Sequence, residues 1–537
     1  MSTTLKELLN QYCASMREGT AAAFIGAGMS GSVGLPDWKG LITHCVDSLN
    51  LKIERENDLP AVTQYFLNRR GGNRSYLNHL VASEFDKPTD TPEGHKSIVR
   101  LPVPTIWTTN FDRIIENAFL AAHRQIDIRR ADSDFAKARR HDVVLYKMHG
   151  DVDRPHKVVL SESDYERYAK THPIFQNALE GDLITKTFLF LGFSFTDPNL
   201  KYMLGHLSSL LGDSKRIHYA IMRRPRLNWD DEKPEEEFEY EINKQQLRVD
   251  NLMRRYCIHT LLVDEFDQVG KVLNALELTY RRKTVFVSGG SFGTGALGPE
   301  RLKPLCRQLS ARLMERGYSL AADFRTDVGR ALLEGAMQKL TEKKLFPSEK
   351  YLVRMLPPNL PQNATQTSFD QECRRAMVNK AGFVVFVGDS QSENGELDFD
   401  LRIATEHPTK TDRAIPIPIG VSGSAALHIW KVVSKSHAYD DLIPADEFQL
   451  LKNGDLDASK IVNAVLAIID AVTETAPDIR SEHTSPLMNR EFYFSLKKQF
   501  PNVPPERLRT IIAEADAEAK RKTYRKGGPA QTRTATE

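Results

Sequence analysis

Apolar residues near the amino terminus recur at helical spacing, so the chain is expected to begin with an amphipathic helix. The apolar positions on the buried face of this helix are Leu5, Leu8, Leu9, Tyr12 and Met16. Residues 20–30 then form a short apolar run that ends in glycines. Such a run is typical of a buried strand that feeds a tight turn.

Similar apolar runs recur along both halves of the chain, with helical patterns between them. In the first half they lie at residues 103–110, 142–150, 186–195, 217–222 and 257–263. In the second half they lie at residues 284–290, 318–323, 350–356, 382–390 and 414–420. Continuous apolar strands separated by helices indicate parallel sheets covered on both faces. We therefore predict an α/β protein with two doubly wound, mostly parallel-sheet, Rossmann-like domains in tandem.

The restart of this alternation gives the expected domain boundaries. Residues 1–280 form the first domain and residues 283–475 the second. Residues 476–537 are expected to be a carboxy-terminal extension, helical in part and with a disordered end. A charged, proline-containing stretch from residue 225 is expected to be a surface excursion before the last strand of the first domain.

The composition mainly excludes classes of partner, namely nucleic acid and membranes. The 537 residues include 41% hydrophobic and 27% charged positions, as in an ordinary folded protein. Lys and Arg number 73 and Asp and Glu 71, a balance of +2, so nucleic acid is not expected as a partner. The basic stretch at residues 520–526 is best explained as a solvated helix end. No run of eighteen apolar residues exists, so no membrane association is expected.

The five cysteines are scattered along the chain and never form a CxxC pair: Cys13, Cys45, Cys257, Cys306 and Cys373. Their spacing predicts neither a disulfide framework nor a four-thiolate zinc site, and no bound metal is expected. The first residues lack a basic segment followed by an apolar core, so no secretory signal is predicted. A reducing, cytoplasmic location is therefore the expectation.

The glycine-containing turn at residues 26–30 is the first candidate site. Glycines after a strand let the backbone approach a diphosphate, and the amides that open the next helix complete an anion site. The same turn could also be glycine-rich for purely steric reasons. Asp37, in the loop that follows, adds a carboxylate that suits a nucleotide pocket.

Two polar side chains stand at the ends of other predicted strands. Asn110 ends one strand in TTNFD, and His149 ends another in KMHGD. Ligands bind at the carboxyl ends of parallel strands, so these residues and the segment 192–199, GFSFTDPN, are expected to face one cleft. Taken singly, Asn110 could cap the helix that follows it, and His149 could be a structural histidine.

In that order, the motifs GAGMS, GLPDW, TTNFD, MHGD and GFS resemble the sirtuin NAD-binding fold over most of residues 1–280. The resemblance implies NAD as substrate, with Asn110 facing the nicotinamide ribose and His149 as general base. It also implies that Asp112 faces the ribose. The residues that would hold the diphosphate and the adenosine half are Gly26, Ala27, Gly28, Ser30, Gly192 and Ser194.

The chain departs from the deacylating sirtuins because it lacks the zinc module of two CxxC pairs. That module helps to form the acyl-lysine cleft, whereas cleavage of NAD with water as acceptor needs only an oriented sugar and stabilisation of positive charge. Hydrolysis of NAD to ADP-ribose and nicotinamide is therefore the leading hypothesis. An NAD-dependent protein deacylase and a non-catalytic module with two nucleotide sites are the alternatives.

The second domain carries its own glycine-rich turn after its first strand. Gly289, Gly290 and Ser291 could contact a phosphate-bearing ligand, or could only close a turn. Arg374 and Arg375 could clamp phosphates or lie solvated on a helix. Glu396 could accept from a ribose hydroxyl or favour a helix amino terminus. This half resembles the SLOG nucleotide-sensor group.

A sirtuin-like domain followed by a SLOG domain resembles the NAD-consuming effector family of the Thoeris anti-phage system. The resemblance implies that a cyclic ADP-ribose isomer, made by a separate TIR-domain protein, binds the SLOG domain and releases NAD hydrolysis. The candidate residues for binding that signal are the ones named above in the second domain: Gly289, Gly290, Ser291, Arg374, Arg375 and Glu396. The resemblance also implies a homo-oligomer, a tetramer or a higher assembly.

Overall fold

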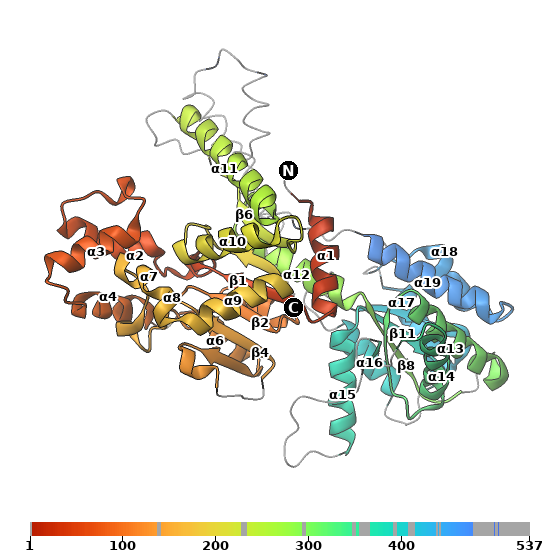
Figure 1. The fold of residues 1–537 in the computed structure, drawn as a ribbon. Helices are drawn as coiled ribbons and strands as arrows, with labels where there is room; N and C mark the ends of the chain where they lie inside the picture. Colours follow the sequence, from red (N-terminus) through yellow and green to blue (C-terminus); the bar gives the residue numbers. More distant parts are fainter. Residues whose placement is uncertain are drawn as a thin grey trace, which may run out of the picture. The chain divides into compact units, whose positions relative to one another are not determined.

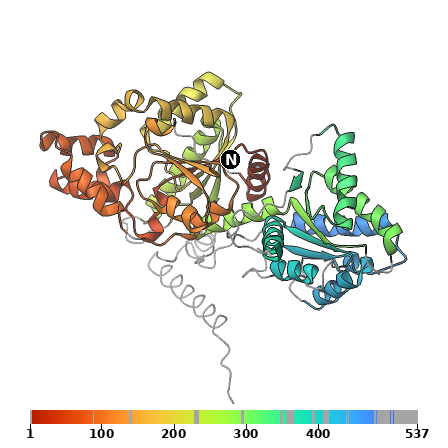
Figure 2. The same ribbon diagram turned by 90° about the horizontal axis from the view of Figure 1, so that it is seen from below.

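The computed structural model describes most of the chain and divides it into two compact units. The described residues are 3–87, 89–136, 141–226, 234–292, 297–345, 351–353, 366–389, 395–405, 414–436, 439, 442–475, 479, 499 and 503. Unit 1 contains the residues up to 273, and unit 2 contains residues 274–478. Each unit has its own sheet (Figures 1 and 2).

Unit 1 is built on a seven-stranded sheet in the order β3-β4-β2-β1-β5-β6-β7. All neighbouring strands run parallel. The strands are β1 (Ala21–Ile25), β2 (Thr105–Thr108), β3 (Ile126–Arg129), β4 (Val143–Lys147), β5 (Thr187–Leu191), β6 (His218–Arg223) and β7 (Ile258–Val263). From β1 outward, the strands on one side are β2, β4 and β3, and those on the other side are β5, β6 and β7. This reversal makes the region beside β1 and β5 a topological switch point, where open α/β sheets bind ligands.

Helices connect these strands. They are α1 (Leu5–Arg17), α2 (Trp38–Ser48), α3 (Leu59–Arg69), α4 (Ser75–Phe85), α5 (Glu93–Arg100), α6 (Ile114–Ala121), α7 (Glu162–Glu166), α8 (Tyr168–Thr171), α9 (Pro173–Thr185), α10 (Pro198–Leu211), α11 (Pro234–Tyr256) and α12 (Asp267–Arg281). The helix predicted at the start of the chain is confirmed as α1, which Thr4 caps by accepting from the Glu7 amide. Its Tyr12 hydroxyl donates to the Ala22 carbonyl of β1 at 2.8 Å.

Helices α2, α3 and α4 form a small helical group with an apolar cluster of their own (Figure 1). Ile42, Phe66 and Val81 supply one buried side chain from each helix. Phe111, which follows β2, belongs to the same cluster. The loop after β2 is therefore anchored on one side by this group of helices.

Unit 2 is built on a five-stranded parallel sheet in the order β10-β9-β8-β11-β12. The strands are β8 (Thr284–Gly289), β9 (Ser319–Ala322), β10 (Leu352–Val353), β11 (Phe383–Val387) and β12 (Ile415–Pro418). The helices are α13 (Gly298–Glu315), α14 (Asp327–Glu342), α15 (Gln366–Lys380), α16 (Glu396–Thr405), α17 (Ser424–Ser434), α18 (Ala445–Leu450) and α19 (Ala458–Glu474). Here the strand order reverses between β8 and β11, which gives unit 2 its own switch point.

The predicted fold class is confirmed, since both units are parallel-sheet α/β structures. The edge strand β3 was not among the predicted strands. Its residues alternate between apolar and charged side chains, and only Asp127 of the four is buried. The charged stretch from residue 225 leads into α11, a helix of 23 residues. The predicted carboxy-terminal extension, 476–537, lies outside the described residues except for three positions.

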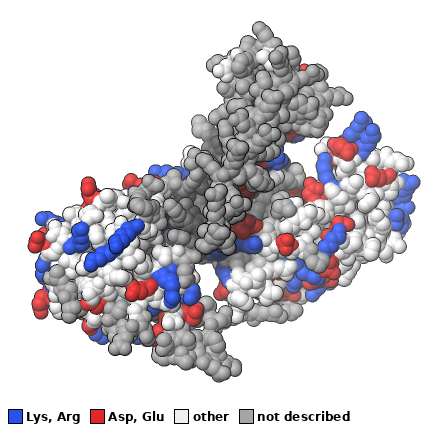
Figure 3. Space-filling view, turned by 180° about the vertical axis from the view of Figure 1, so that it is seen from behind, with Lys and Arg blue, Asp and Glu red and all other residues white. Residues whose placement is uncertain are grey.

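Surface charge follows the near-neutral composition. On the face shown in Figure 3, basic and acidic side chains are interspersed over both units and do not gather into a field of one sign. Within the described part of the chain, no helix is both long and apolar enough to cross a membrane. The five cysteines, all of which lie in that part, carry free thiols.

Candidate active site

The carboxyl ends of four central strands of unit 1 surround a cavity of about 650 Å³. Its walls come from the loops after β1, β2, β4 and β5, at the switch point of the sheet. The residues singled out from the sequence that line it are Ala27, Gly28, Ser30, Asp37, Asn110, Asp112, His149, Gly192 and Ser194. The fold thus brings all but Gly26 of the first-domain candidates to a single cavity.

Glycines let the loops after β1 and β5 pack directly on one another. The Gly26 amide donates to the Leu191 carbonyl and the Gly28 amide to the Gly192 carbonyl, at 2.8 and 3.0 Å. A Cβ on Gly26 would lie 2.5 Å from the Gly192 oxygen. Gly192 has a φ of +59°, in the left-handed region that favours glycine. The glycines therefore have a packing role here, and their contact with a diphosphate stays a prediction.

A short hydrogen-bonded chain holds the Asn110 side chain. Asn110 Nδ2 donates to Ser30 Oγ at 3.3 Å, and Ser30 Oγ donates to Asp112 Oδ2 at 3.1 Å. The other oxygen of Asp112 accepts from the Ile114 amide at 3.0 Å, at the start of α6. Asp112, and not Asn110, therefore satisfies that helix end. The Asn110 amide group is left at the cavity wall, held from one side by the loop after β1.

His149 also lines this cavity and lies beside an aspartate from the loop after β5. His149 Nε2 is 3.5 Å from Asp197 Oδ2, and the Tyr165 hydroxyl donates to the same oxygen at 3.0 Å. Asp197 Oδ1 accepts from the Leu200 amide at 2.9 Å and caps α10. Burial lowers the pKa of His149 below its ordinary 6.5, although Asp197 acts to raise it. The imidazole is therefore neutral near pH 7 and can accept a proton.

Two buried polar atoms in the cavity wall have no hydrogen-bond partner among the residues that the structure describes. These atoms are His149 Nε2 and Trp38 Nε1. Trp38 stacks on Tyr165 with ring centroids 5.9 Å apart. Because buried polar groups are nearly always hydrogen-bonded, two unsatisfied atoms on residues that line one cavity point to a ligand or to water held there.

Asp37 lines this cavity too, but its side chain also has a local structural role. Its Oδ1 accepts from the Gly40 amide at 2.8 Å and caps α2. The aspartate in the loop is thus explained in part by the helix that follows it.

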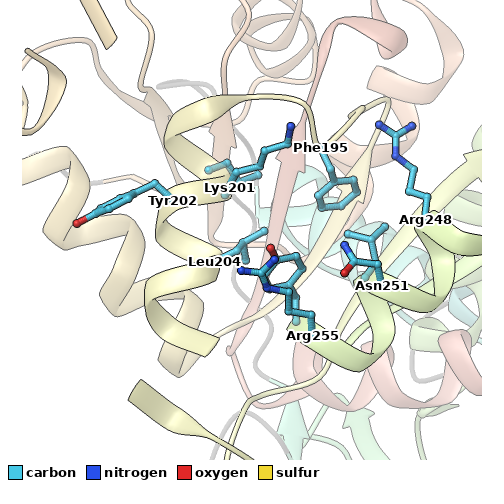
Figure 4. Close-up of a pocket in the computed structure, with 10 residues that line it drawn as sticks. Phe195, Lys201, Tyr202, Leu204, Arg248, Asn251 and Arg255 are labelled. Carbon is cyan, nitrogen blue, oxygen red and sulfur yellow. The ribbon is translucent and has the colours of Figure 1, made fainter. Parts of the chain in front are cut away.

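A second cavity, of about 470 Å³, lies between α10 and α11 and next to the first (Figure 4). Lys201 of α10 and Arg248 and Arg255 of α11 stand around it, over apolar walls that include Phe195 and Leu204. Arg248 lines both cavities, and its Nη2 donates to the Ser194 carbonyl at 2.6 Å. We assign the candidate active site to the larger cavity because the strand ends converge there.

Sequence reasoning singled out neither Tyr165 nor Arg248 of this site, and it included Asp197 only as part of the segment 192–199. Asp197 precedes a proline in TDPN, so its sequence signal is that of a helix cap. Tyr165 and Arg248 lie on helices far from the glycine motifs, and no local pattern marks them. Among the described residues, no cluster of three or more His, Cys, Asp or Glu side chains is arranged to hold a metal.

The predicted effector residues of unit 2 are divided between two environments. Gly289 ends β8, and Gly290 and Ser291 follow it at the switch point, where Ser291 forms an isolated bridge with Asp389 after β11. On α15, Arg375 Nε lies 3.6 Å from Glu372, and both side chains are exposed. The Glu396 side chain is outside the described part, although its backbone begins α16.

Arg374, by contrast, is buried beneath the turn. Its Nη1 lies 2.6 Å from Asp400 Oδ2, and Ser288 Oγ donates to the same oxygen at 2.6 Å. Asp400 is fully buried and Arg374 is 6% exposed. The structure thus gives Arg374 a place in the core next to the predicted effector turn.

Comparison with known proteins finds a matching family model for each of the two units. The SIR2-like domain model matches residues 104–249, and the model of the Sir2- and TIR-associating SLOG family matches residues 268–472. "NAD(+) hydrolase ThsA" of Cytobacillus dafuensis is 30% identical over 88% of this chain and 97% of its own. The protein of that name from Bacillus cereus is 29% identical over 88% and 99%. "Defense-associated sirtuin 2" of Bacillus subtilis is 27% identical over 42% and 23%.

Proposed function

This chain belongs to the family of the NAD(+) hydrolase ThsA proteins, and we propose that the unit 1 cavity breaks the bond between nicotinamide and ribose in NAD⁺. Water accepts the ribosyl group, so the products are ADP-ribose and nicotinamide. The reaction serves defence by depleting NAD. The observation that carries this proposal is that Asn110 and an unsatisfied, neutral His149 line one cavity at the switch point of the sheet.

The chemistry requires little beyond orientation and electrostatics. Nicotinamide leaves as a neutral group, so positive charge develops on the ribose in an oxocarbenium-like transition state. Asn110 orients the ribose or the incoming water through its amide, which Ser30 holds in place. His149 accepts a proton from that water, because its burial keeps the imidazole unprotonated.

Asp197 supports His149 in this step. Its carboxylate lies 3.5 Å from Nε2 and would stabilise the imidazolium that forms when the proton is taken up. Tyr165 fixes the same carboxylate by donating to it. The cavity residues therefore supply both a base and a counter-charge without a metal ion.

We further propose that unit 2 is the switch. A cyclic ADP-ribose isomer, supplied by a TIR-domain protein, binds at Gly289, Gly290 and Ser291 and favours the active assembly of a homo-oligomer, a tetramer or larger. A ligand shifts such an equilibrium only through its differential affinity for the two states. The support is the family match of unit 2 and the place of this turn at a switch point.

The test is nicotinamide release from the purified full chain, with and without a panel of cyclic ADP-ribose isomers. We expect release that one isomer raises strongly and that added acylated peptide leaves unchanged. Stimulation by the peptide would favour a protein deacylase. Binding of NAD in calorimetry without nicotinamide release under any of these conditions would instead indicate a non-catalytic module.

The pH profile gives a separate prediction. Since burial lowers the pKa of His149 below 6.5, the base stays unprotonated on mild acidification, and the acid limb of kcat/KM should lie below pH 6.5. Asp197→Asn removes the charge that raises this pKa and keeps a residue type that caps helices. The acid limb of that variant should move to still lower pH. An unchanged or higher midpoint would contradict the assignment of His149 as the base beside Asp197.

A further inference from the structure

A fully buried lysine lies beneath the candidate active site, and none of the motifs accounts for it. Lys147 is the last residue of β4, two positions before His149, and is 1% exposed. An ammonium group removed from water destabilises a fold strongly unless it is paired and hydrogen-bonded. The position of Lys147 therefore has to be explained by the groups around its Nζ atom.

Four acceptors surround that atom. Nζ lies 2.6 Å from the Asp112 carbonyl and 3.3 Å from the Phe111 carbonyl. It also lies 2.7 Å from Asp151 Oδ2 and 2.9 Å from Glu116 Oε1. These groups satisfy all three N–H donors.

The acceptors belong to the loops that carry the two proposed catalytic residues. Phe111 and Asp112 directly follow Asn110 after β2, and Asp151 follows His149 by two positions after β4. The third element is α6, through Glu116. A single ammonium group thus ties the Asn110 loop to the His149 loop.

Electrostatics keeps this ammonium charged. Burial alone would lower the pKa of Lys147, but Glu116 and Asp151 outweigh it, and the pKa lies above its ordinary value. Asp151 also accepts from Arg130 Nε at 3.0 Å and from the Asp153 amide at 2.8 Å. The loop after β4 is therefore held at several points around the same charge.

We infer that Lys147 is a positioning residue, whose ammonium group sets the placement of Asn110 relative to His149 for the reaction proposed above. This inference rests on that proposed function. Lys147 touches neither the cavity nor a reacting atom, so it acts through the two loops. Displacement of a reacting group by about 1 Å can cost on the order of a hundredfold in rate, so loss of this tie should be visible in kcat.

The primary test is Lys147→Met, an apolar side chain of similar length. We expect kcat for nicotinamide release to fall by about 10- to 100-fold, the scale of a misplaced catalytic group, while KM for NAD is unchanged. Hydrogen exchange followed by mass spectrometry should become faster in peptides that cover residues 109–113. The exchange measurement does not depend on catalysis, so it tests the contacts of Lys147 even in a chain that releases no nicotinamide. Absence of nicotinamide release from the wild-type chain would overturn the proposed function and not this inference.

Two controls separate positioning from loss of stability. Lys186→Met removes another ion-paired lysine, which contacts Asp182 at 2.8 Å and Thr105 Oγ1 at 2.7 Å at the opposite end of the strands. Leu179→Ala opens a cavity in the buried core of α9. Both should keep the wild-type kcat at a temperature well below their Tm. If Leu179→Ala lowered Tm as much as Lys147→Met does and also lost as much kcat, Lys147 would have only a structural role. That result would overturn the inference.

Glu116→Gln provides a variant that keeps the lysine. Glu116 belongs to neither loop, and its side chain accepts a hydrogen bond from Lys147 Nζ at 2.9 Å. We expect Glu116→Gln to lower kcat less than Lys147→Met does and to make hydrogen exchange at residues 109–113 faster than in the wild-type chain. The double variant should have the same kcat as Lys147→Met alone. If Lys147→Met does not fold, a Glu116→Gln chain with both readouts unchanged would still overturn the inference.

Discussion

Replacing His149 by Ala should lower kcat for nicotinamide release by about 10²- to 10⁴-fold, the range expected for loss of a general base. The substitution removes the buried imidazole beside Asp197, whereas Tyr165 and the Leu200 amide still donate to that carboxylate. NAD binding should survive, because the loops after β1 and β5 keep their contacts.

Asn110→Ala should also lower kcat, because the ribose or the attacking water is no longer oriented. The pH profile of this variant should be unchanged.

A matched control for His149→Ala is His206→Ala. His206 lies on α10 with a side chain that is 44% exposed, 3.5 Å from Glu180 and stacked on Tyr202. Its replacement should leave kcat and KM at their wild-type values. If nicotinamide release persisted in His149→Ala, His149 would not be the general base. This conclusion would hold whether or not a ligand of unit 2 activates the reaction.

Arg374→Met should have the largest effect on stability in unit 2. It removes the arginine that lies 2.6 Å from the fully buried Asp400 carboxylate, and loss of one partner of a buried ion pair typically costs about 3–5 kcal/mol. For a unit of this size the Tm of the unit 2 transition should fall on the order of 10 °C. Calorimetry should detect this fall, and binding of the cyclic isomer should weaken because Ser288 leads directly into the predicted effector turn.

Arg375→Met, at the neighbouring position of α15, is the control for Arg374→Met. Its ion pair with Glu372 is exposed on both sides, so the change in stability should be below about 1 kcal/mol. If Arg375 contacts the effector, this variant loses isomer binding with an unchanged Tm. A Tm that falls equally in both variants would contradict the buried role of Arg374.

Much of the fold could be predicted because a parallel sheet covered on both faces requires continuous apolar strands. β1, with Ala21 to Ile25 fully buried, shows this pattern clearly. β3 was missed because Asp127 and Arg129, which pair with each other at 3.2 Å, interrupt the apolar run in this edge strand. The pattern expected for central strands does not apply to it.

The candidate site was predictable where chemistry follows local geometry. Asn110 and His149 could be found because strand ends of a parallel sheet converge, and the structure places both at one cavity. Lys147 could not be found in this way, since a lysine in a strand is ordinarily read as solvated. Its partners Glu116 and Asp151 are 31 and four residues away.

The amino-acid sequence alone determined the periodicity of the elements, the glycine turns after β1, β5 and β8, and the presence of polar residues at strand ends. These features depend on backbone conformation and on neighbours along the chain. Only the tertiary structure decided which charges are buried together, as with Lys147 and Asp151 or Arg374 and Asp400. The reason is that the protonation state of a charged group, and what it does, depend on its burial and on partners that the fold brings from distant positions.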